Sequence, residues 1–293
     1  MYRPVVVGVD GSPSSLVAAE HAARAAVLRS RPLHLVHGYL HPLGYGVPLN
    51  PYDLGLPAPT EEARKMLERT AADLADRWPG LTVQVRQVAG GPGATLVEES
   101  RRAELVVLGS RGLGGFAGLL LGSVGTQVAA HAHCPVLVVR PKEQPIPVDG
   151  PVLVGVDDSD GARLAAGYAA DEAVRRGTPL VLVHVGPPDE DRPVPEEVEE
   201  SRAAYRAEAV RLLAEASAAV RADHPDLVVR EHPVRAASPA RGLVEASGGA
   251  SVLAVGTRGR GGFTGLLLGS VSQAVTQHAH CPVLVAHPYD RAG

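Results

Sequence analysis

Short apolar runs alternate with alanine-rich or amphipathic stretches along the whole chain. The first run, from Val5 to Asp10, is apolar until it ends in an acid, as expected for a strand buried in a parallel sheet. Ser12 and Pro13 then supply an N-cap and a first-turn proline for a helix that we expect to end near Arg29. The chain is thus predicted to begin with a strand that leads directly into a helix.

The same alternation continues to the end of the chain. We expect further strands at 33–37, 81–88, 105–108, 136–139, 152–157, 180–185, 227–230, 252–255 and 283–285. We expect helices at 61–77, 94–101, 123–132, 195–222 and 240–247, and others beginning at residues 159 and 270. Residues 38–60, rich in glycine and proline, are expected to form a long loop that either packs on its own domain or covers a ligand. Strict alternation predicts right-handed crossovers and doubly wound α/β layers.

One unusual motif occurs twice. Gly109-Ser110-Arg111-Gly112 is followed after nine residues by Gly122-Ser123, and Gly256-Thr257-Arg258-Gly259 is followed after nine residues by Gly269-Ser270. The copies lie 147 residues apart, and the same offset relates Asp10 to Asp157 and Cys134 to Cys281. We therefore predict a duplicated domain, with repeats at 1–140 and 151–293 and a proline-rich linker at 141–150.

Composition narrows the function classes. The 293 residues are 45% apolar and 20% charged, with a net charge of −4, which suits two soluble domains. A pI near 6.3 argues against nucleic acid as a partner, and no apolar run reaches the length of a membrane span. The chain enters its first strand without a signal peptide, and its two cysteines suit reduced thiols, so we expect a cytoplasmic protein.

The repeated motif suits phosphate binding. Glycine lets backbone N–H groups approach an anion, and a helix N-terminus adds the positive end of its dipole. Gly122-Ser123 and Gly269-Ser270 stand where a helix begins, whereas the preceding glycines follow a strand and are expected to clear space for ribose and α-phosphate. We expect Asp10 and Asp157 to contact the base, the ribose or a phosphate-bound Mg²⁺. Arg111 and Arg258 either contact phosphate or face solvent.

Competing interpretations of the motifs are weaker. Gly112-x-Gly114-x-x-Ala117 matches a dinucleotide fingerprint, but it follows the fourth strand and no acid stands about 20 residues later. No Gly-Lys-Ser/Thr is present for a P-loop, and no aspartate follows the third strand as a phosphorylated receiver domain requires. His131-x-His133-Cys134 and His278-x-His280-Cys281 resemble metal ligands, yet histidine also suits a helix C-terminus.

Taken together, the motifs resemble the universal stress protein family. The resemblance is carried by Gly-x-x-Gly-x9-Gly-Ser, Val-Gly-Val-Asp on the first strand, Leu-Val-His on the second and Cys-Pro-Val-Leu-Val-Val at the end of the first repeat. It covers 4–139 and 151–285. It implies two tandem Rossmann-like domains, each with a five-stranded parallel sheet, packed through their last strands as an intramolecular pseudo-dimer. A further homodimer stays open.

The resemblance also implies two ATP sites, with Mg²⁺ or Mn²⁺ accompanying the nucleotide. The first would comprise Val9, Asp10, Gly38, Leu108, Gly109, Arg111, Gly112, Gly122, Ser123 and Val124. The second would comprise Val156, Asp157, Val185, Val255, Gly256, Arg258, Gly259, Gly269, Ser270, Val271 and Ser272. We expect weaker binding in the first, because Gly38 stands where the second repeat has Val185 and Gly125 where it has Ser272.

The resulting hypothesis is a stress-response protein that senses or buffers adenine nucleotide by binding rather than catalysis. No nucleophile and base stand together beside the loops, so no catalytic residue is assigned. The alternatives are a slow ATPase, an ATP-dependent adenylyl or phosphoryl transferase, and a scaffold that binds no nucleotide.

Overall fold

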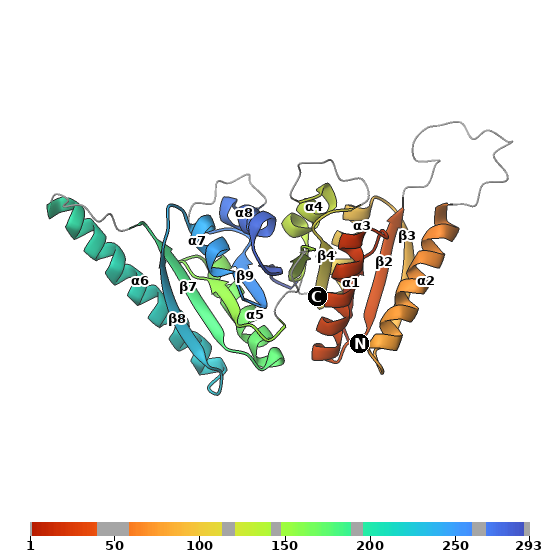
Figure 1. The fold of residues 1–293 in the computed structure, drawn as a ribbon, viewed down its shortest axis with the longest axis horizontal. Helices are drawn as coiled ribbons and strands as arrows, with labels where there is room; N and C mark the ends of the chain where they lie inside the picture. Colours follow the sequence, from red (N-terminus) through yellow and green to blue (C-terminus); the bar gives the residue numbers. More distant parts are fainter. Residues whose placement is uncertain are drawn as a thin grey trace. The chain divides into compact units, whose positions relative to one another are not determined.

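The computed structural model describes residues 2–39, 59–112, 121–141, 148–188, 196–259 and 268–289. Its internal contacts divide the chain into two compact units, Met1–Pro141 with Pro288–Gly293, and Lys142–His287. Each unit contains a β-sheet flanked by helices (Figure 1). One copy of the glycine motif belongs to each unit.

The first unit contains β1 (Val5–Gly8), α1 (Pro13–Arg29), β2 (Leu33–Tyr39), α2 (Pro59–Arg77), β3 (Val83–Ala89), α3 (Pro92–Ser100), β4 (Leu105–Gly109), α4 (Ser123–His131) and β5 (Val136–Val139). The second contains β6 (Val152–Gly155), α5 (Asp160–Arg176), β7 (Leu180–Gly186), α6 (Glu196–Asp223), β8 (Val229–Arg235), α7 (Pro239–Ala246), β9 (Val252–Gly256), α8 (Ser270–His278) and β10 (Val283–Ala286). The strand orders are β3-β2-β1-β4-β5 and β8-β7-β6-β9-β10, and the neighbouring strands are parallel. The predicted α/β class with five parallel strands in each repeat is confirmed, whereas the pseudo-dimer stays a prediction.

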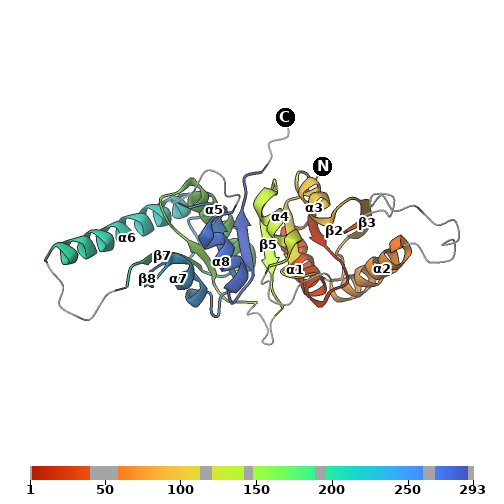
Figure 2. The same ribbon diagram turned by 90° about the horizontal axis from the view of Figure 1, so that it is seen from above.

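Helices cover both faces of each sheet. In the first unit α1 and α2 lie on one face and α3 and α4 on the other; in the second unit α5 and α6 lie opposite α7 and α8 (Figure 2). The order of connection reverses between β1 and β4, and between β6 and β9. Ligands of open α/β sheets bind at the carboxyl ends of such strands, so these two places are where a site is expected.

Several predicted boundaries were wrong. The first strands of the units end at Gly8 and Gly155, two residues before the acids, because the chain leaves the sheet there and the acids bond to the following turn. The loop predicted at 38–60 is too long at both ends, since Gly38 and Tyr39 pair with β3 and α2 begins at Pro59. Residues 40–58 lie outside the described part.

The strand predicted at 227–230 is β8, which begins two residues later and runs to Arg235. Pro233 lies inside it, opposite His184 of β7. A proline donates no hydrogen bond to a ladder, so it is tolerated here because β8 is the edge strand of its sheet. The predicted strand stopped at residue 230, before Pro233, so the sequence pattern missed the C-terminal part of β8.

In each unit the backbone of the first helix lies close to the glycine that ends the strand before the glycine loop. A Cβ added at Gly256 would lie 2.6–2.9 Å from backbone atoms of Gly161 in α5. A Cβ added at Gly109 would lie 2.6–2.7 Å from atoms of Ser14 in α1. Both glycines are therefore required by packing, because the opposing backbone cannot move aside as a flexible side chain can.

We expect Gly256→Ala to destabilise the protein by about 1–3 kcal/mol, the usual cost of overpacking a tight contact. Urea unfolding of the full chain measures this change. Gly167→Ala is the matched control, because a Cβ there meets nothing within 4 Å and Gly167 lies in the interior of α5, so stability should rise by up to about 1 kcal/mol. Equal stability of the two variants would contradict the packing argument.

The two cysteines are buried as free thiols. Cys134 is fully buried in the apolar cluster that packs around β4 and β5. Burial raises the pKa of the Cys134 thiol from 9.0 to about 12, because a thiolate there would lose its hydration. This thiol therefore stays protonated and unreactive in the folded protein.

The raised pKa of Cys134 predicts a pH dependence of stability. Below pH 9 the thiol is protonated in both states, so its contribution to stability is complete; above pH 9 only the unfolded chain releases the proton, and stability falls. The loss from this group should reach about 1.4 kcal/mol at pH 10. Urea unfolding from pH 8 to 10 should show a steeper decline for the natural protein than for Cys134→Ala, and parallel declines would disprove the assignment.

Candidate functional site

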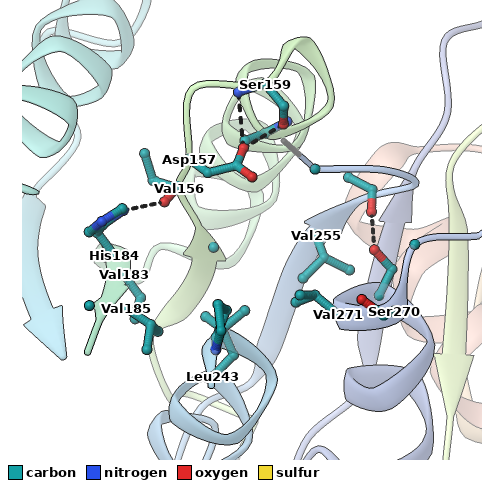
Figure 3. Close-up of a pocket in the computed structure, with 18 of the residues that line it drawn as sticks. Val156, Asp157, Ser159, Val183, His184, Val185, Leu243, Val255, Ser270 and Val271 are labelled. Atoms are coloured by element: carbon teal, nitrogen blue, oxygen red, sulfur yellow. Dashed lines mark hydrogen bonds between the residues drawn. The ribbon is translucent and has the colours of Figure 1, made fainter. Parts of the chain in front are cut away.

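A cavity of about 510 Å³ opens at the carboxyl ends of β6, β7 and β9 in the second unit (Figure 3). Every residue predicted for the second site lines it: Val156, Asp157, Val185, Val255, Gly256, Arg258, Gly259, Gly269, Ser270, Val271 and Ser272. The sequence did not single out as site residues Gly155, Ser159, Ala162, Val183, His184, Gly186, Pro187, Tyr205, Glu208, Pro239 and Leu243. The cavity thus joins residues from distant parts of the repeat.

One side of the cavity is apolar. Val183 and Val185 come from β7, Leu243 comes from α7, and Val255 comes from β9 (Figure 3). Val185 fits closely over α7, since a Cβ added at Gly242 would lie 2.6 Å from Cγ1 of Val185. This wall presents carbon atoms to a ligand and offers few polar partners.

An acid lies between the strand end and the glycine loop. The Oδ1 atom of Asp157 accepts hydrogen bonds from Ser159 N at 3.0 Å and from Ser159 Oγ at 2.5 Å (Figure 3). A Cβ at Gly259 would lie 2.7 Å from the other oxygen, Oδ2, and a Cβ at Gly112 would lie 2.5 Å from Oδ2 of Asp10. The second glycine of each motif therefore makes room for the carboxylate of its own repeat.

The other side of the cavity is a helix start without a side-chain cap. Gly269 is the N-cap of α8, and neither a side-chain hydrogen bond nor an acidic residue satisfies its first turn. Gly122 caps α4 in the same way. Uncapped N–H groups and the positive end of the helix dipole favour an anion at such a position.

Each unit fixes one histidine at the end of its second strand. His184 Nδ1 lies 2.8 Å from the carbonyl oxygen of Val156 (Figure 3). In the first unit His37 Nδ1 lies 2.7 Å from the carbonyl oxygen of Val9. A carbonyl only accepts, so Nδ1 carries the proton and Nε2 is an acceptor when the ring is neutral. Neither histidine was among the predicted site residues, although each ends a Leu-Val-His motif on its strand.

The residues predicted for the first site occupy the corresponding places in the first unit. These are Val9, Asp10, Gly38, Leu108, Gly109, Arg111, Gly112, Gly122, Ser123 and Val124. Leu108 is buried in a hydrophobic cluster with Leu96 and Val124. Burial and the nearby charge of Arg111 lower the pKa of Arg140, so a second cation that the sequence did not suggest stands close to this loop. Residues 113–120 and 260–267, which include Gly114 and Ala117, lie outside the described part.

The apolar wall is built differently in the two units. Gly38 replaces Val185, and Thr95 replaces Gly242 at the facing position of the helix. A Cβ at Gly38 would lie 3.1 Å from Thr95 Oγ1 and 2.8 Å from Cα of Pro92. The volume that valine fills from the strand is thus occupied from α3 by a threonine, which brings a hydroxyl to this place.

Two other predicted groups are placed as follows. The hydroxyl of Ser272 donates to the carbonyl oxygen of Gly256 at 2.5 Å, so it connects α8 to β9.

The His-x-His-Cys segments form no metal site in the described ranges, where no group of three or more His, Cys, Asp or Glu side chains is placed to hold an ion. None of the helices in those ranges has the length and apolarity needed to cross a bilayer.

Comparison with known proteins agrees with this architecture. The model of the universal stress protein family matches residues 1–140 and again residues 150–287. A universal stress protein of Mycolicibacterium smegmatis is 39% identical over 97% of each chain, and one of Mycobacterium tuberculosis is 41% identical over 96% of each. A universal stress protein of Archaeoglobus fulgidus has a similar fold, with a TM-score of 0.69 and 21% identity over 97% of this chain and 98% of that one. The chain therefore belongs to the universal stress protein family and carries the family domain twice.

Proposed function

We propose that this protein binds adenine nucleotide, ATP above all, in the cavity of the second unit and at the matching strand ends of the first. The observation that carries the proposal is the uncapped start of α8, which borders a cavity with an apolar wall. A nucleotide presents an anionic tail and a flat, largely apolar base, and it therefore suits both sides. We infer that the protein acts in the cytoplasm as a nucleotide sensor or buffer in the response to stress.

The size and chemistry of the cavity support this assignment. Its volume of about 510 Å³ lies within the 300–1,000 Å³ usual for small-molecule sites. In the proposed complex the base lies against Val185 and Leu243, the phosphates meet the N–H groups of Ser270 and Val271, and the carboxylate of Asp157 accepts from a ribose hydroxyl or the base. Arg258 adds a positive charge at the loop.

Tyr205 adds an aromatic side chain to the cavity from α6. It lines the cavity although 55% of its surface is exposed. An exposed aromatic ring gains by covering a flat partner, so we assign Tyr205 to the outer face of the base. When the ends of α2 and α6 are aligned, Pro59 stands at the position of Tyr205, so the described part of the first unit has no aromatic side chain at this place.

A divalent ion would be coordinated mainly by the phosphates of the nucleotide. Mg²⁺ in nucleotide sites keeps several waters and uses one or two carboxylates with substrate phosphates. Asp157 and Asp10 are the carboxylates nearest the two glycine loops among the described side chains. When bound with ATP, Mg²⁺ would neutralise charge on the phosphates, and Asp157 or Asp10 would hold it.

We expect the double variant Gly122→Ala/Gly269→Ala to bind MgATP at least ten-fold more weakly. A Cβ at Gly122 would meet protein atoms only at 3.7 Å and beyond, so Gly122→Ala should leave the fold intact. A Cβ at Gly269 would lie 3.3 Å from the carbonyl oxygen of Thr257, so this backbone must shift by a few tenths of an ångström in Gly269→Ala. The added methyl groups would obstruct the phosphates at the N–H donors. Isothermal titration calorimetry measures the affinity, with Gly167→Ala as control, and an unchanged affinity would reject the phosphate assignment.

We expect the second site to bind ATP more tightly than the first, because Val185 gives the base an apolar contact where the first site has a threonine hydroxyl. The exchange Val185→Gly/Gly242→Thr should weaken the second site about five-fold, which corresponds to about 1 kcal/mol of apolar contact. The measurement is a titration in the Gly122→Ala background, where the second site dominates. Identical affinities before and after the exchange would contradict this ranking.

The fate of bound ATP distinguishes a sensor from an enzyme. A sensor should retain ATP in stoichiometric amount through purification, as native mass spectrometry would detect. Many rapid turnovers of added ATP would instead favour the ATPase or transferase alternative.

A further inference from the structure

A second cavity lies in the second unit, on the face of the sheet covered by α5 and α6. Its volume is about 220 Å³, and we name it the α5–α6 trough. Between the two helices its lining is mostly small or apolar and includes Gly167, Ala170 and Ala219. Val156, Asp157 and Ala162 also line the nucleotide cavity, so the two cavities are neighbours.

The first unit fills the matching place with its own side chains. Trp78 follows α2 as His224 follows α6, because both N–H groups bond four residues back, to Leu74 and to Val220. The indole N–H of Trp78 donates to Oε1 of Glu20 in α1 at 3.0 Å. Glu20 corresponds to Gly167, since α1 and α5 align along their whole length.

The second unit thus has a smaller side chain than the first at both ends of one contact. Trp78 and Glu20 bridge α1 and α2, whereas His224 and Gly167 leave the trough between α5 and α6. A Cβ at Gly167 meets nothing within 4 Å, so the space beside it is open. An apolar cavity of about 150 Å³ is enough to take up benzene, and this trough is larger.

The charges around the trough are mainly acidic. Asp157, Asp158, Glu215 and Asp223 belong to its lining, and Arg163 is the fixed cation there. Arg163 pairs with Asp158 and, outside the trough, with Asp160, and Glu215 pairs with Arg211, which also lies outside the trough. The acidic residues of the lining still outnumber the cations that pair with them, and Asp223 makes no ion pair with the described residues. A cationic ligand is therefore favoured over an anionic one.

We propose that the α5–α6 trough is a binding site for a small aromatic amine, distinct from the nucleotide site. The aromatic ring would lie where the first unit places the indole of Trp78, against Ala170 and Ala219. The ammonium group would face Asp223 at the rim. The volume lies below the range usual for drug-sized ligands, so a free molecule of one or two rings fits and a folded partner does not.

The test uses the full chain and tryptamine, with neutral indole and anionic indole-3-acetate as comparison probes. Saturation-transfer NMR and calorimetry should show saturable tryptamine binding, at least ten-fold tighter than binding of indole-3-acetate. The variant Gly167→Glu/His224→Trp restores the pair found in the first unit and should weaken tryptamine binding at least ten-fold. Gly167→Leu, which places an apolar side chain in open space, should do the same if the double variant folds poorly.

Val210→Trp is the matched control, because Val210 is an exposed residue of α6 that does not line the trough. It should leave tryptamine affinity unchanged. No saturable binding at millimolar tryptamine would overturn the proposal, as would equal binding of indole-3-acetate. Displacement of tryptamine by ATP, together with full binding by Gly167→Leu, would place the probe in the nucleotide cavity and would also overturn it.

Discussion

The contact of a helix backbone with a glycine at a strand end is the constraint on which both sites depend. Gly256 and Gly109 carry no side chain because Gly161 and Ser14 occupy that space. The close approach brings the turn after the first strand beside the glycine loop. As a result, Asp157 lies next to Gly259, and Asp10 lies next to Gly112. An ordinary side chain at the strand end would separate the acid from the loop and open the crevice.

Much of the architecture could be predicted from the sequence because its signals are local and occur twice. The apolar runs, the caps at Ser12 and Ser159 and the repeated glycine motif each report on a few neighbouring residues. The same local signals identified the residues around Asp157 and Gly269. Duplication helped further, since a pattern that recurs at one offset is unlikely to arise by chance.

What the sequence did not reveal depends on residues distant in the chain. Tyr205 reaches the cavity from α6, about twenty residues along the chain from β7, and a single exposed tyrosine carries no local signal. The exchange of Gly38 and Thr95 for Val185 and Gly242 is visible only when strand and helix face each other. The trough likewise becomes visible only when α5 and α6 lie side by side, because Gly167 in the sequence is simply one glycine within a helix.

Pro233 has a consequence for the outer boundary of the second sheet. Edge strands with free N–H groups can recruit a strand from another molecule, and this is a route to polymerisation. The ring nitrogen of Pro233 offers no donor at the centre of β8, and exposed Arg230 and Glu231 add charge beside it. An incoming strand would lose part of its ladder and would desolvate both charges, so lateral growth of this sheet is disfavoured.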